Sequence, residues 1–527
     1  MNTSNGVSLS PWLATVRIPE FAPISGDVHT QVCVIGAGIA GLTTAYLLAR
    51  EGKHVVLIDA LGIGAGETGR STAHFFPPDE WYRGVEAAFD ADHAKLVADS
   101  FKQAVNLVES IARSEHIDCA FERVDGYLYA LPEQGFQDLG REYQAAQRAG
   151  ADVTLLERAP GLSFDTGPCV CYHNQAQCHP LRYLEGLASA LVRHGGRIYC
   201  GVRAHGVDGD RHIQVVRTDR GDIYAEAVVV ATNTPFNNVV VMHTKQAAYR
   251  TYALGLRIPR GSVPRVLLWD TGDPYYYVRV ESPAGADHDL LLVGGADHKV
   301  GQDDHPQHRY DEIEQWARQR FPMAQQVAYR WSGEVMEPAD GAAYLGRNPM
   351  DQDNVYVITG DSGNGMTHGT IGAMIVSELI MGRRHAWADL YDPARKVMHG
   401  LPEFVAEQAN TLSYYGEWAT AGEVESVAEI APGQGAIVRQ GMHKLAVYRD
   451  PHGELHALSA RCTHLGCVVH WNAGECSWDC PCHGSRFDTQ GAVLHGPASS
   501  ALAAATLEPP PGAPPAGPGD TEHVRRP

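Results

Sequence analysis

Residues 31–60 read QVCVIGAGIAGLTTAYLLAREGKHVVLIDA, and this stretch predicts the fold of the larger part of the chain. It begins with a short apolar strand and passes through the turn GAGIAG into a helical pattern. It ends in a second apolar strand, which is closed by Asp59. A strand, a G-x-G-x-x-G turn, a helix and a second strand with a terminal acid form the unit that binds dinucleotides. The stretch therefore predicts an α/β domain of the Rossmann type.

The glycines of this turn have separate roles. Gly36 permits the tight turn, Gly38 lets the backbone approach a pyrophosphate, and Gly41 lets the helix pack closely on the strand. The helix N-terminus offers N–H groups and a positive dipole end to the phosphates. Asp59 is placed to accept hydrogen bonds from an adenosine ribose. A turn that binds nothing is the disfavoured alternative, because every part of the unit is present in order.

The first turn alone does not distinguish NAD from FAD as the cofactor. A second glycine-rich turn bears on this choice. The strand NVYVIT at residues 354–359 precedes the loop GDSGNGMT at 360–367 and then the apolar helix pattern TIGAMIVSELIMG. Such a loop can present N–H groups to the edge of a flavin that becomes anionic on reduction. An ordinary strand–loop–helix packing unit is the alternative.

A metal-site pattern lies in residues 462–488, CTHLGCVVHWNAGECSWDCPCHGSRFD. Cys462-x-His464 is followed, after fifteen residues, by Cys480-x-x-His483. This order differs from that of a Cys₂His₂ zinc finger, and it suits a [2Fe–2S] cluster with two thiolates on one iron and two imidazoles on the other. Neutral imidazoles raise the reduction potential, into a range of about −150 to +300 mV. A zinc site or a loose cysteine cluster is the alternative.

Length and composition limit the classes of function. A chain of 527 residues with 44% apolar and 20% charged residues predicts two to four globular domains. The formal charge of −20, from 42 basic and 62 acidic residues, argues against nucleic-acid binding. The sequence has no run of 18 apolar residues and no signal-peptide pattern, so we expect a cytoplasmic protein without a transmembrane segment.

The stretch 462–488 resembles a Rieske domain of the cytochrome bc type. The resemblance implies a disulfide between Cys467 and Cys482 that ties the two ligand loops together. It also implies that Ser485 donates a hydrogen bond to a cluster sulfur. Phe487 stands where a tyrosine is often found, so we expect a potential below the top of the Rieske range. Residues 496–498, Gly-Pro-Ala, resemble the third loop, which covers the cluster.

Residues 30–385 resemble the D-amino-acid oxidase superfamily, which includes sarcosine and glycine oxidases. The resemblance is carried by the first glycine turn, VVVATN at 228–233, PADGAAYLG at 338–346 and GDSGNGMTHG at 360–369. It implies an FAD domain built from separated segments, with a substrate domain formed by inserts at about 78–149 and 245–330. The cofactor contacts that it implies, beyond those of the first turn, are Thr68, Arg70, Ser71, Thr72, Ala204, Gly363, Asn364, Gly365, Met366 and Thr367.

The substrate side is less determined. The strand end GGADHKVG at 294–301 resembles the place where sarcosine oxidases hold a lysine over the flavin, which implies a catalytic role for Lys299. An exposed Lys299 without a catalytic role is an alternative of equal weight. The neighbouring His298 is a candidate base, although a lone histidine is more often structural or exposed. Three arginines are only candidates for binding a substrate carboxylate: Arg250, Arg257 and Arg279.

Three further groups of residues have both a functional interpretation and one as ordinary packing. A second metal could be held by the residues Cys169, Cys171, His173, Cys178 and His179, but the start of a helix at 178–180 is favoured. One side of the run Tyr275–Tyr277 could line a substrate pocket, although sheet packing is the more common use. Trp331, Trp387 and Trp418 are expected to be packing residues rather than electron carriers.

The predicted architecture is an α/β FAD-binding Rossmann-like domain with an interleaved α+β substrate domain, followed by an all-β Rieske domain. The expected segments are a lead-in at 1–29, the oxidoreductase domain at 30–385, a connector at 386–423, the Rieske domain at 424–507 and a disordered Pro-rich tail at 508–527. No Gly/Ser linker precedes the Rieske domain, so we expect it to be docked rather than loosely tethered.

We expect an FAD-dependent oxidoreductase that oxidises a small amine or amino acid and passes electrons through the cluster to or from a partner protein. One alternative is an oxidase that reduces O₂ directly, with a structural or sensory cluster. Another is a non-catalytic redox sensor. A Rieske oxygenase is disfavoured, because no mononuclear iron site of two histidines and a carboxylate is evident near the cluster.

Overall fold

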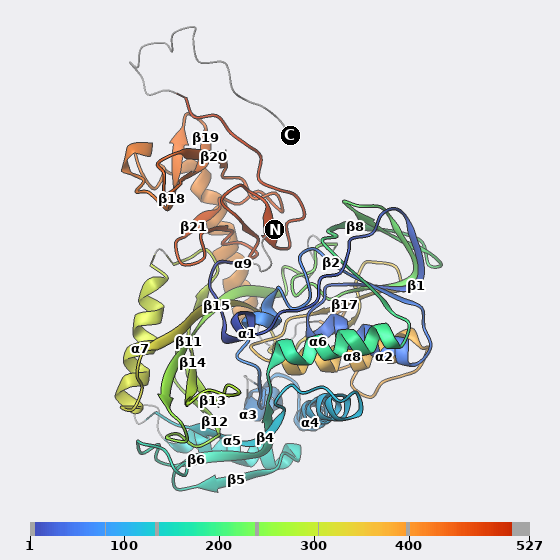
Figure 1. Cartoon of the computed structure of the whole chain (residues 1–527), viewed down its shortest axis with the longest axis vertical. Coiled ribbons are helices and arrows are strands. Elements are labelled where there is room, and N and C mark those ends of the chain that lie inside the picture. Colours follow the sequence, from blue (N-terminus) through green and yellow to red (C-terminus); the bar gives the residue numbers. More distant parts are fainter. Residues whose placement is uncertain are drawn as a thin grey trace.

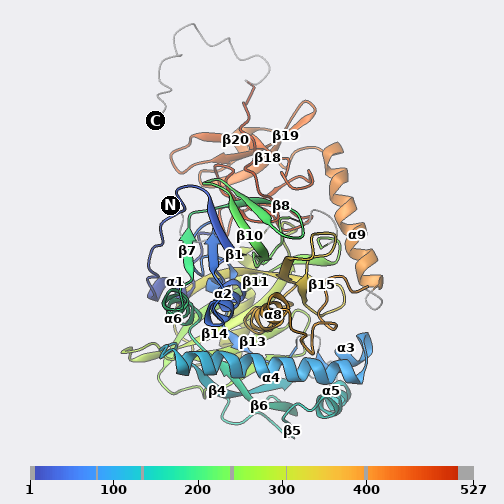
Figure 2. The same ribbon diagram turned by 90° about the vertical axis from the view of Figure 1, so that its right-hand side faces the viewer.

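The computed structural model describes residues 6–78, 81–131, 136–237, 242–303, 305–396 and 401–508, except for the side chains of 401–404. All of the predicted Pro-rich tail except Glu508 lies outside these residues. Two large sheets, each covered by helices, form the body of the molecule, and a small β domain with its connecting helix sits on top (Figures 1 and 2).

The first large sheet has eight strands in the described part of the chain. They are β1 (Val28–Ile35), β2 (Val55–Asp59), β7 (Arg197–Cys200), β8 (Ala204–Gly209), β9 (Gln214–Thr218), β10 (Ile223–Val230), β16 (Tyr344–Arg347) and β17 (Val355–Thr359). The order is β16-β17-β10-β1-β2-β7, with β9 pairing with β10 and β8 with β9. β1 is parallel to both β2 and β10, and β10 is parallel to β17. This is the sheet that the first glycine turn predicted.

Helices cover one face of this sheet. They are α2 (Ile39–Arg50), α6 (Pro180–Arg193) and α8 (Gly365–Ile380), which lie side by side in Figure 2. In β1, Val32 and Val34 pack into the helix-covered core, whereas Cys33 and Ile35 pack into a separate core on the other face. Because both faces are buried, the strand reads as a continuous apolar run.

The second large sheet has nine strands in the described residues. They are β3 (His74–Phe75), β4 (Glu122–Tyr129), β5 (Val153–Leu156), β6 (Cys169–Gln177), β11 (Gln246–Pro259), β12 (Leu267–Asp270), β13 (Tyr276–Glu281), β14 (His288–Lys299) and β15 (Val327–Pro338). The helices α3 (Trp81–Ala88), α4 (Ala91–Ser114), α5 (Phe136–Ala149) and α7 (Gln307–Arg320) belong to the same segments.

This second sheet extends beyond the expected inserts. It includes β6, and β15 continues to Pro338. Of the five residues of the disfavoured second metal site, Cys169, Cys171 and His173 lie in β6, which pairs with β4 and β5, and Cys178 and His179 lie between β6 and α6. The predicted helix start is also present: His179 caps α6, accepting a hydrogen bond from the N–H of Arg182.

The small domain contains two antiparallel sheets. Its strands are β18 (Gln434–Gln440), β19 (His443–Arg449), β20 (Leu455–Ser459), β21 (His470–Asn472), β22 (Ser477–Asp479), β23 (Arg486–Phe487) and β24 (Val493–His495). The connector forms α9 (Leu401–Tyr415), and short helical turns lie at η1 (Glu67–Arg70), η2 (Gly416–Ala419) and η3 (Val427–Glu429). In the described residues, no helix combines the length and the apolar character needed to cross a bilayer.

The small domain is docked on the large body through buried polar contacts. The lead-in, with its short helix α1 (Pro11–Thr15), takes part in them. Arg70 Nη1 lies 3.2 Å from Glu475 Oε1, and both side chains are almost fully buried. Ser332 Oγ donates to the same carboxylate at 2.6 Å, and the Ser8 hydroxyl also donates to it. Arg70 is therefore a docking residue, although it also borders the cavity described below.

We expect Glu475→Gln to destabilise the docked state by about 3 kcal/mol, because it leaves the Arg70 guanidinium buried without its counter-charge. Urea unfolding followed by limited proteolysis of the 386–423 connector measures the effect. Glu454→Gln, an exposed change in the same domain, is the control. A midpoint for Glu475→Gln equal to that of the control would contradict the docking role.

Candidate functional site

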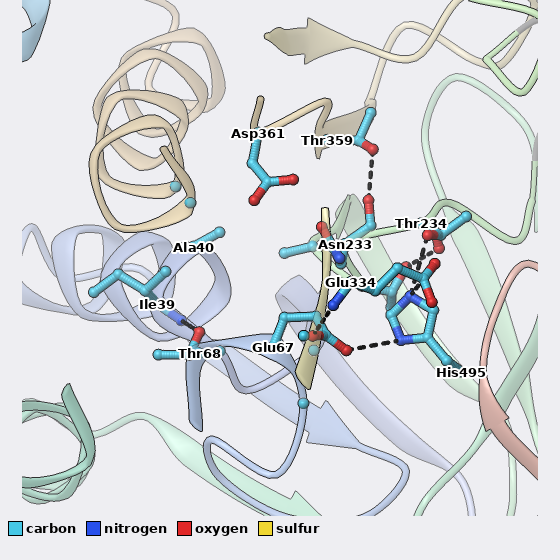
Figure 3. Close-up of a pocket in the computed structure, with 18 of the residues that line it drawn as sticks. Ile39, Ala40, Glu67, Thr68, Asn233, Thr234, Glu334, Thr359, Asp361 and His495 are labelled. Atoms are coloured by element: carbon cyan, nitrogen blue, oxygen red, sulfur yellow. Dashed lines mark hydrogen bonds and ion pairs between the residues drawn. The ribbon is translucent and has the colours of Figure 1, made fainter. Parts of the chain in front are cut away.

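One long cavity runs along the carboxyl edge of the first sheet. Its walls include the first glycine turn, the N-terminus of α2, the segment after β10 and the N-terminus of α8 (Figure 3). The predicted cofactor residues that line it are Gly36, Gly38, Asp59, Thr68, Arg70, Ser71, Thr72, Ala204, Gly363, Gly365 and Met366. The structure thus brings together residues that are more than 300 positions apart in the sequence.

The first turn has the geometry of a phosphate cradle. Gly36 has φ +107, and a side chain there would come within 2.4 Å of the carbonyl oxygen of Ala231. Gly38 caps α2 without a side chain, so the helix end is open to the cavity. Thr68 Oγ1 accepts a hydrogen bond from the N–H of Ile39 at 3.1 Å. Gly41 serves packing, since a side chain there would meet the Gly36 carbonyl at 1.9 Å.

Asp59 borders the cavity and also holds the turn in shape. Its carboxylate accepts hydrogen bonds from the N–H groups of Ala37, Leu61 and Gly62, each at 2.8 Å. Burial raises its pKa, and these hydrogen bonds act in the opposite direction. Oδ1 accepts two of these hydrogen bonds and Oδ2 one, so Oδ2 keeps a lone pair that can accept a ribose hydroxyl.

A second helix N-terminus opens into the same cavity. Asn364 caps α8 without a side-chain hydrogen bond to the helix. Asn364 Oδ1 and Thr367 Oγ1 are buried and make no hydrogen bond to any described residue. Two helix N-termini and unpaired buried polar atoms beside one cavity fit an anionic dinucleotide with a polar ring system. The residues present therefore fit FAD.

Lys299 lies away from this cavity. It is not among the described residues that line it, and its Nζ donates to Glu407 Oε2 of α9 at 2.6 Å. A register shift between β11 and β14 places Ala296 and Asp297 opposite the single residue Thr251. Such a bulge changes where the following side chains point. Asp297, not Lys299, lines the cavity.

Asp297 belongs to an aromatic end of the cavity, formed with Phe76, Thr251, Tyr275 and Tyr277. Thr251 Oγ1 lies 3.2 Å from the Tyr277 hydroxyl, and the two tyrosine rings are 5.9 Å apart. Asp297 Oδ1 is buried and has no hydrogen-bond partner among the described residues. Burial raises the pKa of Asp297 to about 6, although a Thr251 hydrogen bond opposes the shift.

The strand alternation of the tyrosine run divides its side chains between two environments. Tyr275 and Tyr277 face the cavity, whereas Tyr276 stacks on Trp316 at 4.9 Å. Tyr275 and Tyr277 are therefore pocket residues, as one interpretation of the run predicted, and Tyr276 is a packing residue, as the other predicted. Trp331 is fully buried, and its Nε1 donates to the Arg70 carbonyl. Trp418 is the one of the three tryptophans that contacts a ligand loop, donating to the Gly466 carbonyl at 3.0 Å.

The three candidate arginines do not line the cavity in the described residues. Arg279 is buried and donates to the carbonyls of Thr72, Ala73 and Cys178. Arg250 is also buried, and its Nη1 donates to Ser332 Oγ at 2.8 Å. Arg257 is exposed. No carboxylate-binding arginine is thus assigned at the aromatic end.

Two matching turns hold the predicted cluster ligands. In the first turn, the N–H of Gly466 donates to the Cys462 carbonyl at 3.0 Å. In the second, the N–H of Gly484 donates to the Cys480 carbonyl at 3.1 Å. The two glycines have φ values of +86 and +81, which glycine adopts without strain. This equivalence explains why both loops carry a glycine four residues after a cysteine.

The side chains of these turns converge. The structure contains the Cys467–Cys482 disulfide that the Rieske resemblance implied. The rings of His464 and His483 are 4.9 Å apart. His483 Nδ1 is buried and makes no hydrogen bond within the described part of the chain. A hydrogen bond with Cys480 lowers the pKa of the Cys462 thiol. Two buried free thiols beside two imidazoles fit a [2Fe–2S] cluster.

Two neighbours of the ligands bear on the expected potential, which stays a prediction. Ser485 forms a hydrogen bond with the Cys462 sulfur and accepts one from the N–H of Ala498 at 3.0 Å. Phe487 is fully buried and offers no hydroxyl. Gly496 and Ala498 of the third loop also line the cavity. The third loop therefore lies between the second ligand turn and the cavity.

Glu334 forms a wall shared by the cavity and the small domain. It lines the cavity and is 2% exposed. A side chain at Gly484, next to the predicted ligand His483, would come within 2.5 Å of Glu334 Oε1. His495 Nε2, also from the small domain, lies 3.5 Å from the same oxygen (Figure 3). One side chain thus separates the cavity from a ligand turn.

The environment of Glu334 favours its neutral form. Burial raises its pKa well above the usual range, and the Glu67 carboxylate raises it further. Glu67 Oε2 accepts a hydrogen bond from the N–H of Glu334 at 2.6 Å. Neither carboxyl oxygen of Glu334 has a hydrogen-bond partner among the described residues. The sequence contains no pattern that predicts a role for Glu334, because its place between the cavity and the ligand turn depends on how the small domain docks on the body.

Comparison with known proteins identifies both parts of the chain. The sequence model of the family described as FAD dependent oxidoreductase (DAO) matches residues 31–379. The chain belongs to this family. The model of the Rieske [2Fe-2S] domain matches residues 418–506. The protein is therefore an FAD-dependent oxidoreductase with a Rieske-type [2Fe–2S] centre, as the sequence predicted.

Individual relatives support this assignment. The "Putative Rieske 2Fe-2S iron-sulfur protein YhfW" of Bacillus subtilis (strain 168) is 30% identical over 498 residues, 93% of this chain and 96% of its own. Gamma-glutamylputrescine oxidoreductase of Escherichia coli (strain K12) is 25% identical over 402 residues, 71% of this chain and 89% of its own. The structure of glycine oxidase from Geobacillus kaustophilus aligns with a TM-score of 0.59 at 19% identity, covering 70% of this DAO-family chain and 99% of that chain. The predicted fold class is confirmed.

Proposed function

We propose that this DAO-family protein oxidises the C–N bond of a small amine, bound as a cation, and passes the electrons to its own Rieske cluster. The observation that carries the proposal is the shared wall: Glu334 lines the cavity and packs against Gly484 in a ligand turn. When bound, FAD accepts two electrons from a substrate, and the cluster accepts them one at a time. An external acceptor protein then removes the electrons.

The cofactors are assigned to the residues that fit them. FAD is held by the two helix N-termini, by Asp59 and by the loop 64–74. The cluster is held by Cys462, His464, Cys480 and His483. The body of the protein provides the elements of the flavin site and the docked small domain those of the cluster, so that the two sites are held next to each other.

The aromatic end of the cavity supports a cationic substrate. Asp297 offers an unpaired carboxylate oxygen, and Tyr275 and Tyr277 offer aromatic ring faces. An ammonium ion is attracted by both kinds of group. The described lining residues at this end include no arginine or lysine, so an amino-acid carboxylate has no charge partner there. The E. coli relative is named for a derivative of putrescine, which is an amine.

A direct oxidase has less support. Lys299, the residue that would favour direct reaction with O₂, pairs with Glu407 and does not line the cavity. At the aromatic end, the described lining residues therefore include no lysine to stabilise a developing superoxide.

Anaerobic mixing with candidate substrates tests the proposed class. We expect at least one of butylamine, putrescine and N-acylated putrescine to bleach the flavin absorption. Glycine, sarcosine and proline should leave it unchanged. Each compound is mixed at several concentrations, and the flavin and Rieske bands are followed by stopped flow. Bleaching by the amino acids alone would contradict the cationic-amine assignment.

A further inference from the structure

A third histidine lies against the two predicted histidine ligands. The ring centroid of His243 is 4.8 Å from that of His464 and 5.8 Å from that of His483. His243 comes from the oxidoreductase part of the chain, just before β11, and is 3% exposed. Both of its ring nitrogens are buried, and a backbone hydrogen bond with Pro235 acts on the ring. Burial of an imidazole costs free energy, so its position against two predicted ligands needs an explanation.

The turn that carries His243 is held on several sides. The Lys245 ammonium donates to the carbonyls of Pro393 and Arg395, at 2.8 and 2.9 Å. Gln408 of α9 donates to the Thr244 carbonyl at 3.0 Å. The connector therefore fixes the turn, and the ring of His243 is fixed with it.

The same turn is linked to the cavity wall. Gln246, three residues after His243, donates from Nε2 to Thr359 Oγ1 at 3.1 Å. Thr359 lines the cavity and donates in turn to the Asn233 carbonyl, another part of the wall (Figure 3). A hydrogen bond thus links the cavity wall to Gln246, the backbone joins Gln246 to His243, and the His243 ring packs against the ligand rings.

We propose that His243 is a positioning residue that holds the two cluster histidines and couples them to the cavity wall. Groups that contact metal ligands orient them and tune the metal site. This inference rests on the proposed internal transfer. The cluster, held by Cys462, His464, Cys480 and His483, would accept one electron at a time from the reduced flavin. Two such transfers, with an external one-electron acceptor taking up the first electron before the second, would account for both substrate electrons, and the protons would leave to water.

The test uses the full-length protein loaded with both cofactors and avoids the substrate. The flavin is reduced anaerobically by a light flash in the presence of EDTA, and reduction of the cluster is followed by EPR. In His243→Phe and His243→Gln we expect cluster reduction to slow at least about tenfold and the EPR g-values to shift, with iron content unchanged. His385→Phe is the control, because His385 also packs edge-on against an aromatic ring, that of Trp387.

The outcomes separate the two proposals. Fully loaded variants with the rate and g-values of the unmodified protein would overturn the role of His243. If one variant does not load iron, the other decides. Absence of cluster reduction in the unmodified protein would instead refute internal transfer. Failure of amines to bleach the flavin, with His243 dependence intact, would refute only the substrate class.

Discussion

Cys480→Ser is expected to remove the [2Fe–2S] cluster and to abolish electron transfer to an external one-electron acceptor. Cys480 is 2% exposed and begins the second ligand turn, so its thiolate has no replacement among the described side chains at that position. A serine hydroxyl is a poor ligand for iron in such a centre. The cavity should remain intact, because Cys480 does not line it in the described residues.

The measurement combines EPR, flavin content and amine-dependent reduction of cytochrome c. We expect the Rieske EPR signal to be lost, FAD to be retained, and cytochrome c reduction to fall by at least about 100-fold, the upper end of what loss of an outer-shell partner of a metal site costs. Cys476→Ser is the matched control, since Cys476 is a free cysteine of the same domain outside the ligand turns. Undiminished cytochrome c reduction in Cys480→Ser would show that electrons bypass the cluster.

Asp297→Asn is expected to lower kcat/KM for amines by about 10- to 100-fold. The substitution keeps the shape of the side chain but removes the charge that pairs with an ammonium ion. A hydrogen bond to a charged group contributes about 1.5–3 kcal/mol, and 1.4 kcal/mol corresponds to a factor of ten. Asp287→Asn, an exposed carboxylate on the turn before β14, is the control.

The pH profile gives a second test of Asp297. Because its pKa is raised to about 6, the carboxyl group is ionised above that pH and neutral below it. We therefore expect kcat/KM to fall as the pH drops below about 6. Asp361, also at the cavity, has a pKa raised to about 6 by burial, so the profile alone does not identify the group. An acid limb that persists unchanged in Asp297→Asn would assign it to another group.

The local motifs of this chain were predictable, because each is a short stretch with its own geometry. The turn GAGIAG specifies φ at Gly36 and close packing at Gly41, and both appear in the structure. The two cysteine loops likewise contain their glycines and their disulfide. Burial on both faces made β1 readable as a strand.

The residues that sequence reasoning missed depend on register or on docking. A bulge opposite Thr251 includes Asp297, which lines the cavity in place of the predicted Lys299, and one extra residue in a strand is invisible in a sequence pattern. The run Gly294-Gly295 just before it was the available signal. Glu334 and His243 acquire their places only when the small domain sits on the body, which no local pattern encodes.

The central claim is that electrons pass within one molecule from the flavin cavity to the Rieske cluster. Flash photoreduction of the flavin, followed by rapid-freeze EPR of the cluster over a tenfold range of protein concentration, tests it most directly. The shared wall at Glu334 predicts that the cluster is reduced at a rate independent of protein concentration. A cluster that stays oxidised, or a rate that rises in proportion to concentration, would contradict internal transfer.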